Sequence, residues 1–278
     1  MSYKIVVDSC CELPEEYMND SRFERVPLEL MVGDYTISDD DNFNQLDFIK
    51  RVAASPLCPK SACPSPERYM NAYNCDAEHV YCITLSAKLS GSYNSAVLAT
   101  ELFEETYGSK QIAVFDSESA SVGETQLAMY IMRLEEQGLA FDEIVKKVNH
   151  YRDNVHTYFV LNNIDTLRKN GRLSGIKALV ASTLNIKPVL AGEKGNIVQR
   201  GQGIGIKKAL NKMVELIVNE IKDSEKRILM ISQCNAPERA AMVKEMILAK
   251  QKYLKVFILE MRGTSTMYAN DGGIIVTM

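Results

Sequence analysis

The feature that most constrains the fold is the alternation of short apolar runs with helical segments through the first 155 residues. Apolar runs at residues 4–8, 80–85 and 111–115 are each followed by a segment with a helix-starting proline or with the apolar spacing of a helix. Strands that alternate with helices are typical of a parallel sheet with helices packed on its faces. We therefore expect an α/β protein with a mostly parallel, doubly wound sheet and flanking helices in its N-terminal half.

The turn after the second of these strands is rich in small polar residues. Ser90, Gly91 and Ser92 lie between the strand at residues 80–85 and a helix expected at residues 92–105. The first amides of a helix have no intrahelical acceptor and their dipoles point outward together, so this turn can bind a carboxylate or a phosphate. The alternative is that Ser90 or Ser92 only caps the helix.

A second serine-bearing segment, residues 55–66, contains four prolines. Proline removes a backbone donor and restricts the residue before it, so this segment is predicted to be a stiff loop that can hold Ser61 and Ser65 in place. Serines also come directly after the first and third strands, as Ser9 and Ser117. Because ligands bind at the carboxyl edge of open parallel sheets, we expect a ligand site where these serines meet.

From residue 156 the regular alternation ends, which indicates an α+β unit. We place a domain boundary near residue 155, with an N-terminal α/β domain at 1–155 and a C-terminal α+β domain at 156–278. The elements expected there are strands at 157–161, 227–232 and 255–260, a hairpin of 186–190 with 196–199, and helices at 164–169, 176–184, 206–221 and 237–250.

Residues 23–32 alternate charged and apolar side chains, which is typical of an exposed strand. The turn at residues 33–34 and the β-prone run at 35–37 predict that this strand continues into a hairpin. The acidic run at residues 39–41 has no evident spacing of metal ligands. We interpret it as a solvated loop that caps a helix at residues 43–53.

The charge balance gives no support to several classes of function. A formal net charge of −4 provides no electrostatic argument for binding nucleic acid or an anionic membrane. No apolar run approaches the roughly 20 residues that span a bilayer, and the chain begins with a strand-like segment instead of a signal peptide. We therefore expect a cytoplasmic protein that has no membrane anchor and binds no nucleic acid.

The sequence lacks the common catalytic motifs. It has no Walker A loop and no Gly-x-Ser-x-Gly elbow, and its three histidines have no helical metal spacing. The seven cysteines form no Cys-x-x-Cys pair, so neither structural zinc nor a disulfide framework is expected. Cys10 and Cys63 lie in the candidate loops, where a reactive thiol is the alternative to a small apolar filler.

Arg172 is the strongest cationic candidate. It lies in a loop beside Gly171 and Ser174, where a guanidinium can form paired hydrogen bonds with a carboxylate or phosphate. An equally weighted alternative is a surface arginine that caps the carbonyls of the preceding helix. Hydroxyls, glycines and a few arginines together suit the binding of an anion without chemical transformation.

These segments together resemble the DegV family of bacterial proteins that bind long-chain fatty acids. The resemblance rests on Lys-Ile-Val-Val-Asp-Ser at 4–9, Ser-Ala-Cys-Pro-Ser at 61–65, Leu-Ser-Ala-Lys-Leu-Ser-Gly-Ser-Tyr-Asn-Ser at 85–95, Val-Phe-Asp-Ser at 114–117, Leu-Arg-Lys-Asn-Gly-Arg-Leu-Ser at 167–174, Asn-Ile-Lys-Pro at 185–188 and Lys-Lys-Ala at 207–209. The matches follow one another in order over nearly the whole chain.

The resemblance implies a two-domain α/β fold with the acyl chain in a buried tunnel and its carboxylate at the loop edge of the sheet. The family's carboxyl-binding hydroxyls fall on Ser61 and Ser90, and its head-group arginine falls on Arg172. The resemblance further implies no cofactor and a separate ATP-dependent fatty acid kinase as partner. That kinase would convert the bound fatty acid to acyl-phosphate for phospholipid synthesis.

The sequence departs from the family pattern near its end. Many members have a His-Thr-Gly-Pro-Gly segment whose histidine joins the head-group site, and Ser265 stands roughly at that position. Two other hypotheses remain open from the sequence. One is a small-molecule hydrolase or transferase with Ser90 as nucleophile, and the other is a regulatory protein that senses an acyl ligand.

Overall fold

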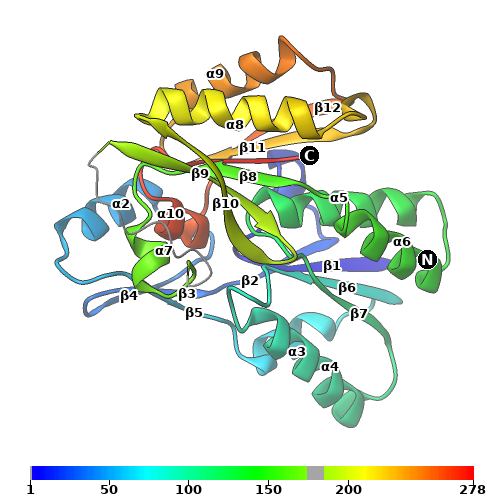
Figure 1. Cartoon of the computed structure of the whole chain (residues 1–278). Coiled ribbons are helices and arrows are strands. Elements are labelled where there is room, and N and C mark those ends of the chain that lie inside the picture. Colours follow the sequence, from blue (N-terminus) through cyan, green and yellow to red (C-terminus); the bar gives the residue numbers. More distant parts are fainter. Residues whose placement is uncertain (1, 174–184) are drawn as a thin grey trace.

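Four parallel strands form the sheet of the N-terminal half (Figure 1) in a computed structural model that describes residues 2–173 and 185–278. The strands are β1 (Tyr3–Asp8), β2 (Phe23–Val26), β6 (His79–Thr84) and β7 (Gln111–Asp116), in the order β2-β1-β6-β7. Every neighbouring pair is parallel, which confirms the predicted sheet. The helix expected at residues 176–184 lies outside the described residues.

Helices cover both faces of this sheet. They are α3 (Pro66–Tyr73), α4 (Ser92–Tyr107), α5 (Val122–Glu136) and α6 (Phe141–Arg152). Because successive side chains of a strand point to opposite faces, Val6 packs with α3 and α4, whereas Ile5 and Val7 pack with α5 and α6. Strands that are buried on both faces are continuous apolar runs in sequence, which is why the sequence alone predicts β1 and β6.

The C-terminal half contains a six-stranded mixed sheet. Its strands are β8 (Thr157–Val160), β9 (Ile186–Glu193), β10 (Asn196–Ile204), β11 (Ile228–Gln233), β12 (Lys255–Glu260) and β13 (Ile274–Thr277), in the order β10-β9-β8-β13-β11-β12. The β9–β10 hairpin is confirmed and is longer than predicted. Helices α8 (Ile206–Glu220) and α9 (Pro237–Leu248) bury their apolar sides on one face of this sheet.

Helix α5 lies between the two large sheets (Figure 1). Its Leu127 and Ile131 pack against the N-terminal sheet, whereas Val122 and Met129 pack with Met230 of β11. This arrangement explains why almost every residue of the helix is buried. Among the described residues, the large sheet formed before residue 155 and the large sheet formed after it have no strand in common. The domain boundary near residue 155 stays a prediction.

A third, small sheet corrects the prediction for residues 23–32. That segment is not one exposed strand, because Pro27 separates β2 from β3 (Glu29–Val32). Proline interrupts the ladder since it has no N–H to donate. β2 pairs with β1 in the parallel sheet, whereas β3 pairs with β4 (Tyr35–Ser38) in the predicted hairpin.

The proline-rich segment is also more ordered than predicted. Within it, β5 (Lys60–Ala62) pairs with β3 in antiparallel fashion, with Ser61 opposite Leu30. A stiff loop alone was expected here. The ladder now fixes the backbone of Ser61, so that its side chain has a defined direction.

Asp39, the first residue of the acidic run at 39–41, has a different role from the one predicted, whereas Asp41 is exposed as expected. Asp39 is only 1% exposed, and its carboxylate accepts hydrogen bonds from the backbone amides of Gly263 and Thr264 at 2.8 and 2.7 Å. It therefore caps α10 (Gly263–Ala269), a helix that the sequence did not predict. The cap of α2 (Gln45–Ala54) is instead Asn44, whose side chain accepts from the Asp47 amide.

The remaining short elements are α1 (Glu15–Met18), α7 (Asp165–Lys169) and a 3-10 turn at Ser224–Lys226. Within the described residues, no helix combines the length and the apolar composition that crossing a bilayer requires.

Candidate functional site

An apolar pocket lies at the carboxyl ends of the parallel strands, at the edge that the sequence predicts for a ligand. Cys10, Leu85 and Ala120, which follow β1, β6 and β7, line one side, and Phe159 and Ile197 of the C-terminal sheet line the other. The space between these residues measures about 840 Å³, a value that includes open solvent. The surface of the pocket is mainly apolar, as is typical of small-molecule sites.

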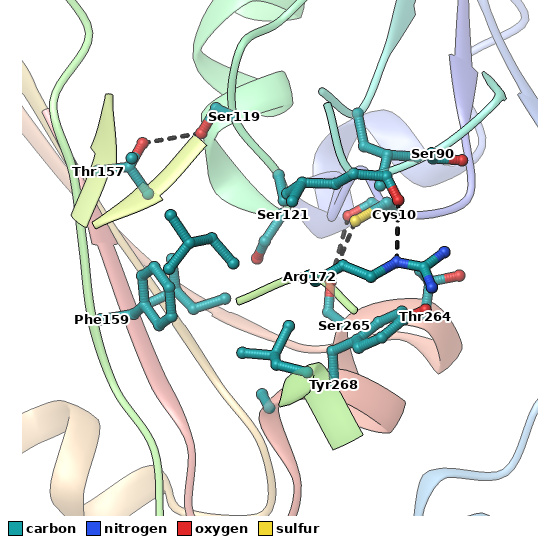
Figure 2. A pocket seen from close by; sticks show the side chains of 18 of the residues that line it. Cys10, Ser90, Ser119, Ser121, Thr157, Phe159, Arg172, Thr264, Ser265 and Tyr268 are labelled. Carbon is teal, nitrogen blue, oxygen red and sulfur yellow. Dashed lines mark hydrogen bonds between the residues drawn. The ribbon is translucent and has the colours of Figure 1, made fainter. Parts of the chain in front are cut away.

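Ser90, Arg172 and Tyr268 lie near one another on one side of the pocket (Figure 2). Ser61, Ser90, Arg172 and Tyr268 all line it. The Arg172 Nε donates to the backbone carbonyl of Leu89 at 3.1 Å, directly beside Ser90. The guanidinium carbon of Arg172 lies 5.7 Å from the Tyr268 ring centroid, and the Tyr268 hydroxyl lies 3.1 Å from the Ser61 Oγ. These contacts join four distant segments of the chain into one polar end, which we call the head-group end.

Arg172 satisfies both alternatives that the sequence left open. Its Nη1 donates to the carbonyl of Asn170, the residue that ends α7, at 2.5 Å. It also lines the pocket. Among the described residues, its Nη2 has no hydrogen-bond partner, so this nitrogen can donate to a ligand carboxylate.

The structure separates the three residues of the turn before α4. Ser90 lines the pocket. Its Oγ also accepts a hydrogen bond from the backbone amide of Ser92, the first residue of α4, at 3.2 Å. Ser92 is buried away from the pocket lining, where its Oγ accepts from the Tyr69 hydroxyl at 3.1 Å. Gly91 lies outside the lining, and a side chain there would contact the Sγ of Cys63 at 3.1 Å.

Three of the four secondary serine candidates lie outside the pocket lining. Ser9 donates to Asp39 at 2.9 Å, Ser65 caps α3, and Ser117 donates to the carbonyl of Ser119 at 3.2 Å. Each of these contacts stabilises local structure. Ser265 does line the pocket, but its hydroxyl lies 3.6 Å from the Cys10 Sγ, away from Ser61.

Tyr268 is the pocket residue that sequence reasoning missed. It lies one helical turn after Ser265 on α10, and its hydroxyl contacts Ser61 while its ring lies against Arg172. A helix predicted at 263–269 would have placed residues 265 and 268 on one face. The three-residue spacing of Ser265 and Tyr268 therefore indicates a shared face only once residues 263–269 are known to be a helix, and the sequence did not predict that helix.

Two hydroxyls line the opposite side of the pocket, and the sequence alone does not predict them as site residues. The Oγ of Ser119 and the Oγ1 of Thr157 lie 2.8 Å apart (Figure 2). Both residues also line a second, polar cleft, which contains Arg152 and Arg200. The hydrogen-bonded pair therefore forms part of the wall between the apolar pocket and the polar cleft.

Three buried carboxyl groups lie behind the Cys10 wall. Burial raises the pKa of Asp8 to about 6, against the opposing effect of amides that donate to it. Burial also raises the pKa of Glu12 to about 8 and that of Glu124 well above its ordinary value. Burial and the neighbouring charge of Glu124 raise the pKa of the Cys10 thiol, which disfavours the thiolate and argues against a reactive Cys10.

Comparison with known sequences gives one consistent family. A sequence model for the DegV family, which is described as a family of uncharacterised proteins, matches residues 2–277. A DegV domain-containing protein of Streptococcus pyogenes serotype M1 is 36% identical to this chain over 282 aligned residues, which cover 99% of each chain.

Two solved structures show the same fold with lipid bound. A DegV family protein from Ruminococcus gnavus, refined with vaccenic acid, is 49% identical and superposes with a TM-score of 0.98 over 100% of both chains. The fatty acid kinase (Fak) B3 protein of Streptococcus pneumoniae, loaded with linoleic acid, is 31% identical. It superposes with a TM-score of 0.90 over 100% of this chain and 99% of its own.

Proposed function

Because the chain belongs to the DegV family, we propose that it binds one long-chain fatty acid. The acyl chain would lie in the apolar pocket, with the carboxylate at the end that holds Ser61, Ser90, Arg172 and Tyr268. The observation that carries this proposal is the chain of contacts from Ser61 through Tyr268 to Arg172, which brings two hydroxyls and the guanidinium together in a pocket whose surface is mainly apolar. Bound vaccenic and linoleic acid in two similar proteins support it.

The energetics of the pocket suit such a ligand. A buried methylene contributes roughly 0.8 kcal/mol, so a dozen methylenes contribute roughly 10 kcal/mol before the cost of immobilising the chain. The head-group end therefore has only to orient the carboxylate and neutralise it. Arg172 supplies the charge, and Ser61, Ser90 and Tyr268 supply neutral donors.

Binding of matched lipids to delipidated protein tests this proposal. We expect oleate to bind with a stoichiometry of one and oleyl alcohol, which has the same chain, to bind more weakly. Replacement of Arg172 by Gln should weaken oleate binding by roughly 10- to 100-fold, as for a lost charge-assisted hydrogen bond, and leave oleyl alcohol unaffected. Delipidated protein that binds neither lipid would contradict the proposal.

We further propose that the protein presents its fatty acid to a separate ATP-dependent kinase in the cytoplasm. The name of the similar pneumococcal protein, a fatty acid kinase B3 protein, supports this partner. The test combines loaded protein, a purified fatty acid kinase and ATP, and we expect acyl-phosphate to form. Fatty acid that remains unphosphorylated, while a known carrier is turned over by the same kinase, would limit the function to binding.

The geometry does not favour the hydrolase alternative. A nucleophilic serine requires an adjacent base. In the described part of the chain, the Ser90 hydroxyl accepts the Ser92 amide and has no hydrogen bond to a histidine or a carboxylate. We therefore propose that the protein is a binding protein and that no covalent acyl-serine forms.

A further inference from the structure

Two buried hydroxyl groups lie together on the side of the pocket opposite Arg172 (Figure 2). Ser119 lies in the loop between β7 and α5, and Thr157 is the first residue of β8. The Ser119 Oγ and the Thr157 Oγ1 lie 2.8 Å apart, and the two residues are only 7% and 8% exposed. We call them the hydroxyl pair. The pocket is therefore polar opposite the head-group end as well, although most of its surface is apolar.

The hydroxyl pair keeps hydrogen-bonding capacity that the protein does not use. Each hydroxyl has one O–H to donate and two lone pairs with which to accept, and the contact between the two uses one O–H and one lone pair. Within residues 2–173 and 185–278, neither hydroxyl has a second hydrogen-bond partner in the pocket or in the polar cleft. One O–H group is therefore left to donate, and buried donors of this kind are normally satisfied.

The surrounding backbone fixes the position of the hydroxyl pair. Thr157 pairs with Gly192 of β9 in the C-terminal sheet, and the Ser119 carbonyl accepts the Ser86 amide at 2.8 Å. Glycine makes room on both sides, because a Cβ added at Gly123 would lie 2.0 Å from the Ser119 Oγ and one added at Gly192 would lie 3.4 Å from the Thr157 Cβ. The pair is therefore positioned before a ligand binds, which lowers the entropic cost of recognition.

We propose that the hydroxyl pair recognises a hydroxyl group in the half of the acyl chain far from the carboxylate, so that the preferred ligand is a hydroxylated long-chain fatty acid. This inference rests on the fatty-acid binding proposed above, which puts the carboxylate beside Arg172 and hence the far half of the chain toward the pair. A chain hydroxyl can accept the spare O–H and donate to a free lone pair. A saturated chain would exclude water from the pair and return no hydrogen bond.

A second carboxylate on the ligand would suit this side of the pocket less well. Glu118, which precedes the serine of the pair in sequence, also lines the pocket, and its charge would repel an anion. The two arginines of the neighbouring polar cleft are already paired, Arg152 with Asp153 at 2.8 Å and Arg200 with Glu193 at 2.5 Å. A neutral oxygen that can both donate and accept therefore matches the hydroxyl pair better than a charged group does.

Competition binding to the delipidated full chain tests this inference with stearate and four hydroxylated forms of it. We expect at least one of 10-, 12- and 14-hydroxystearate to bind roughly fivefold more tightly than stearate, as for one added neutral hydrogen bond. 2-Hydroxystearate, whose hydroxyl lies beside the carboxylate, should show no such gain. Ser119→Ala combined with Thr157→Val removes both hydroxyls and keeps nearly all of the side-chain volume, and it should bring the affinity ratio of hydroxystearate to stearate down to about one.

Ser265→Ala is the matched control. It removes another hydroxyl of the pocket lining, one that contacts Cys10, and it should keep the gain. The inference is overturned if wild-type protein binds stearate but binds none of the three far-half isomers more tightly, because water then satisfies the pair, or if the gain survives in the double variant. Binding of none of these lipids would overturn the proposed function as well. The wild-type comparison decides the matter even where the double variant does not fold.

Discussion

Tyr268 supplies the hydroxyl that connects the proline-rich segment to α10. Its phenol contacts Ser61, whereas Ser265, one turn earlier, directs its hydroxyl to Cys10. The two residues therefore differ in what they offer a ligand, although both line the pocket. We propose that Tyr268 contacts the ligand carboxylate and that Ser265 does not, because the Tyr268 hydroxyl contacts Ser61 whereas the Ser265 hydroxyl contacts Cys10.

This contrast predicts opposite outcomes for two conservative substitutions. Tyr268→Phe should weaken oleate binding by roughly 3- to 10-fold, because it removes one neutral hydrogen bond worth about 1 kcal/mol. Ser265→Ala, the matched control, should change oleate affinity less than twofold. Calorimetric titration of delipidated variants measures both, and a larger loss in Ser265→Ala would assign the head-group role to that residue.

Ser61 and Ser90 act together on the carboxylate in this account. The double variant Ser61→Ala with Ser90→Ala should weaken oleate binding by roughly 1–3 kcal/mol, because buried carboxylate oxygens lose their donors. Affinity for oleyl alcohol should fall less. Unchanged oleate affinity in the double variant would remove both serines from the site.

At the scale of elements, β8 and the loop after β7 supply the hydroxyl pair that lines the side of the pocket opposite Arg172. Thr157→Ala together with Ser119→Ala should open the pocket toward the polar cleft, because the hydroxyl pair lines both spaces. We expect the longest acyl chain that binds with full affinity to increase by roughly two carbons. Thr157→Val keeps the side-chain shape and should keep the length limit. A series of saturated fatty acids measures the limit, and an identical limit in the double variant would place the chain end elsewhere.

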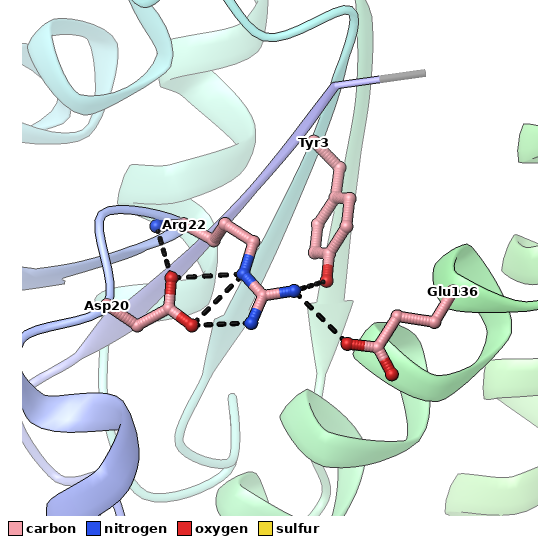
Figure 3. A network of polar contacts seen from close by, with 4 residues as sticks. All are labelled: Tyr3, Asp20, Arg22 and Glu136. Carbon is pink, nitrogen blue, oxygen red and sulfur yellow. Dashed lines mark hydrogen bonds and ion pairs between the residues drawn. The ribbon is translucent and has the colours of Figure 1, made fainter.

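A polar network joins β1, α5 and the turn before β2 at the amino-terminal end of the parallel sheet (Figure 3). Arg22 donates to Asp20 at 2.6–3.0 Å, to the Tyr3 hydroxyl of β1 at 2.7 Å and to Glu136 of α5 at 3.1 Å. Hydrogen bonds from Arg22 lower the pKa of Asp20. The ionised form of Asp20 therefore stabilises the folded state.

This shift predicts a pH-dependent effect of Asp20→Asn. At pH 7 the variant should lose about 0.5–1 kcal/mol of unfolding free energy, a value reduced for solvent screening. Because the pKa of Asp20 is lower in the folded state than its unfolded value of 3.8, ionised Asp20 stabilises the folded protein at pH values above 3.8. The loss should therefore shrink as the pH falls below that value toward the folded-state pKa. Urea unfolding at pH 7 and pH 3 measures it, with the exposed Glu136→Gln as a near-neutral control. An equal loss at both pH values would contradict the assignment.

The sequence predicts the helices and strands whose apolar residues repeat with a clear helical or strand spacing. It does not predict elements whose formation depends on contacts with residues far away in the chain. Strands β1, β6 and β7 and helices α4 and α5 lie where the apolar pattern places them, although β7 is mostly half-buried instead of buried as predicted. Helix α10 was missed because its N-terminal cap, Asp39, lies more than 220 residues earlier. The break between β2 and β3 depends on pairing with two different sheets, although Pro27 marks it.

At the scale of the whole molecule, the candidate site depends on both halves of the chain. Ser61 and Ser90 come from before residue 155, and Arg172 and Tyr268 come from after it. Sequence motifs could indicate most of these residues one by one. They could not show that Ser90 lines the pocket while Ser92 does not, because that distinction depends on which way each side chain points at the start of α4.

The most direct test of the central claim is mass spectrometry of protein purified from bacteria, in the native state and after extraction with organic solvent. The account predicts one long-chain fatty acid per chain, lost on delipidation and restored by added oleate. Protein that carries no fatty acid and takes up no oleate after delipidation, although it remains folded, would contradict the account.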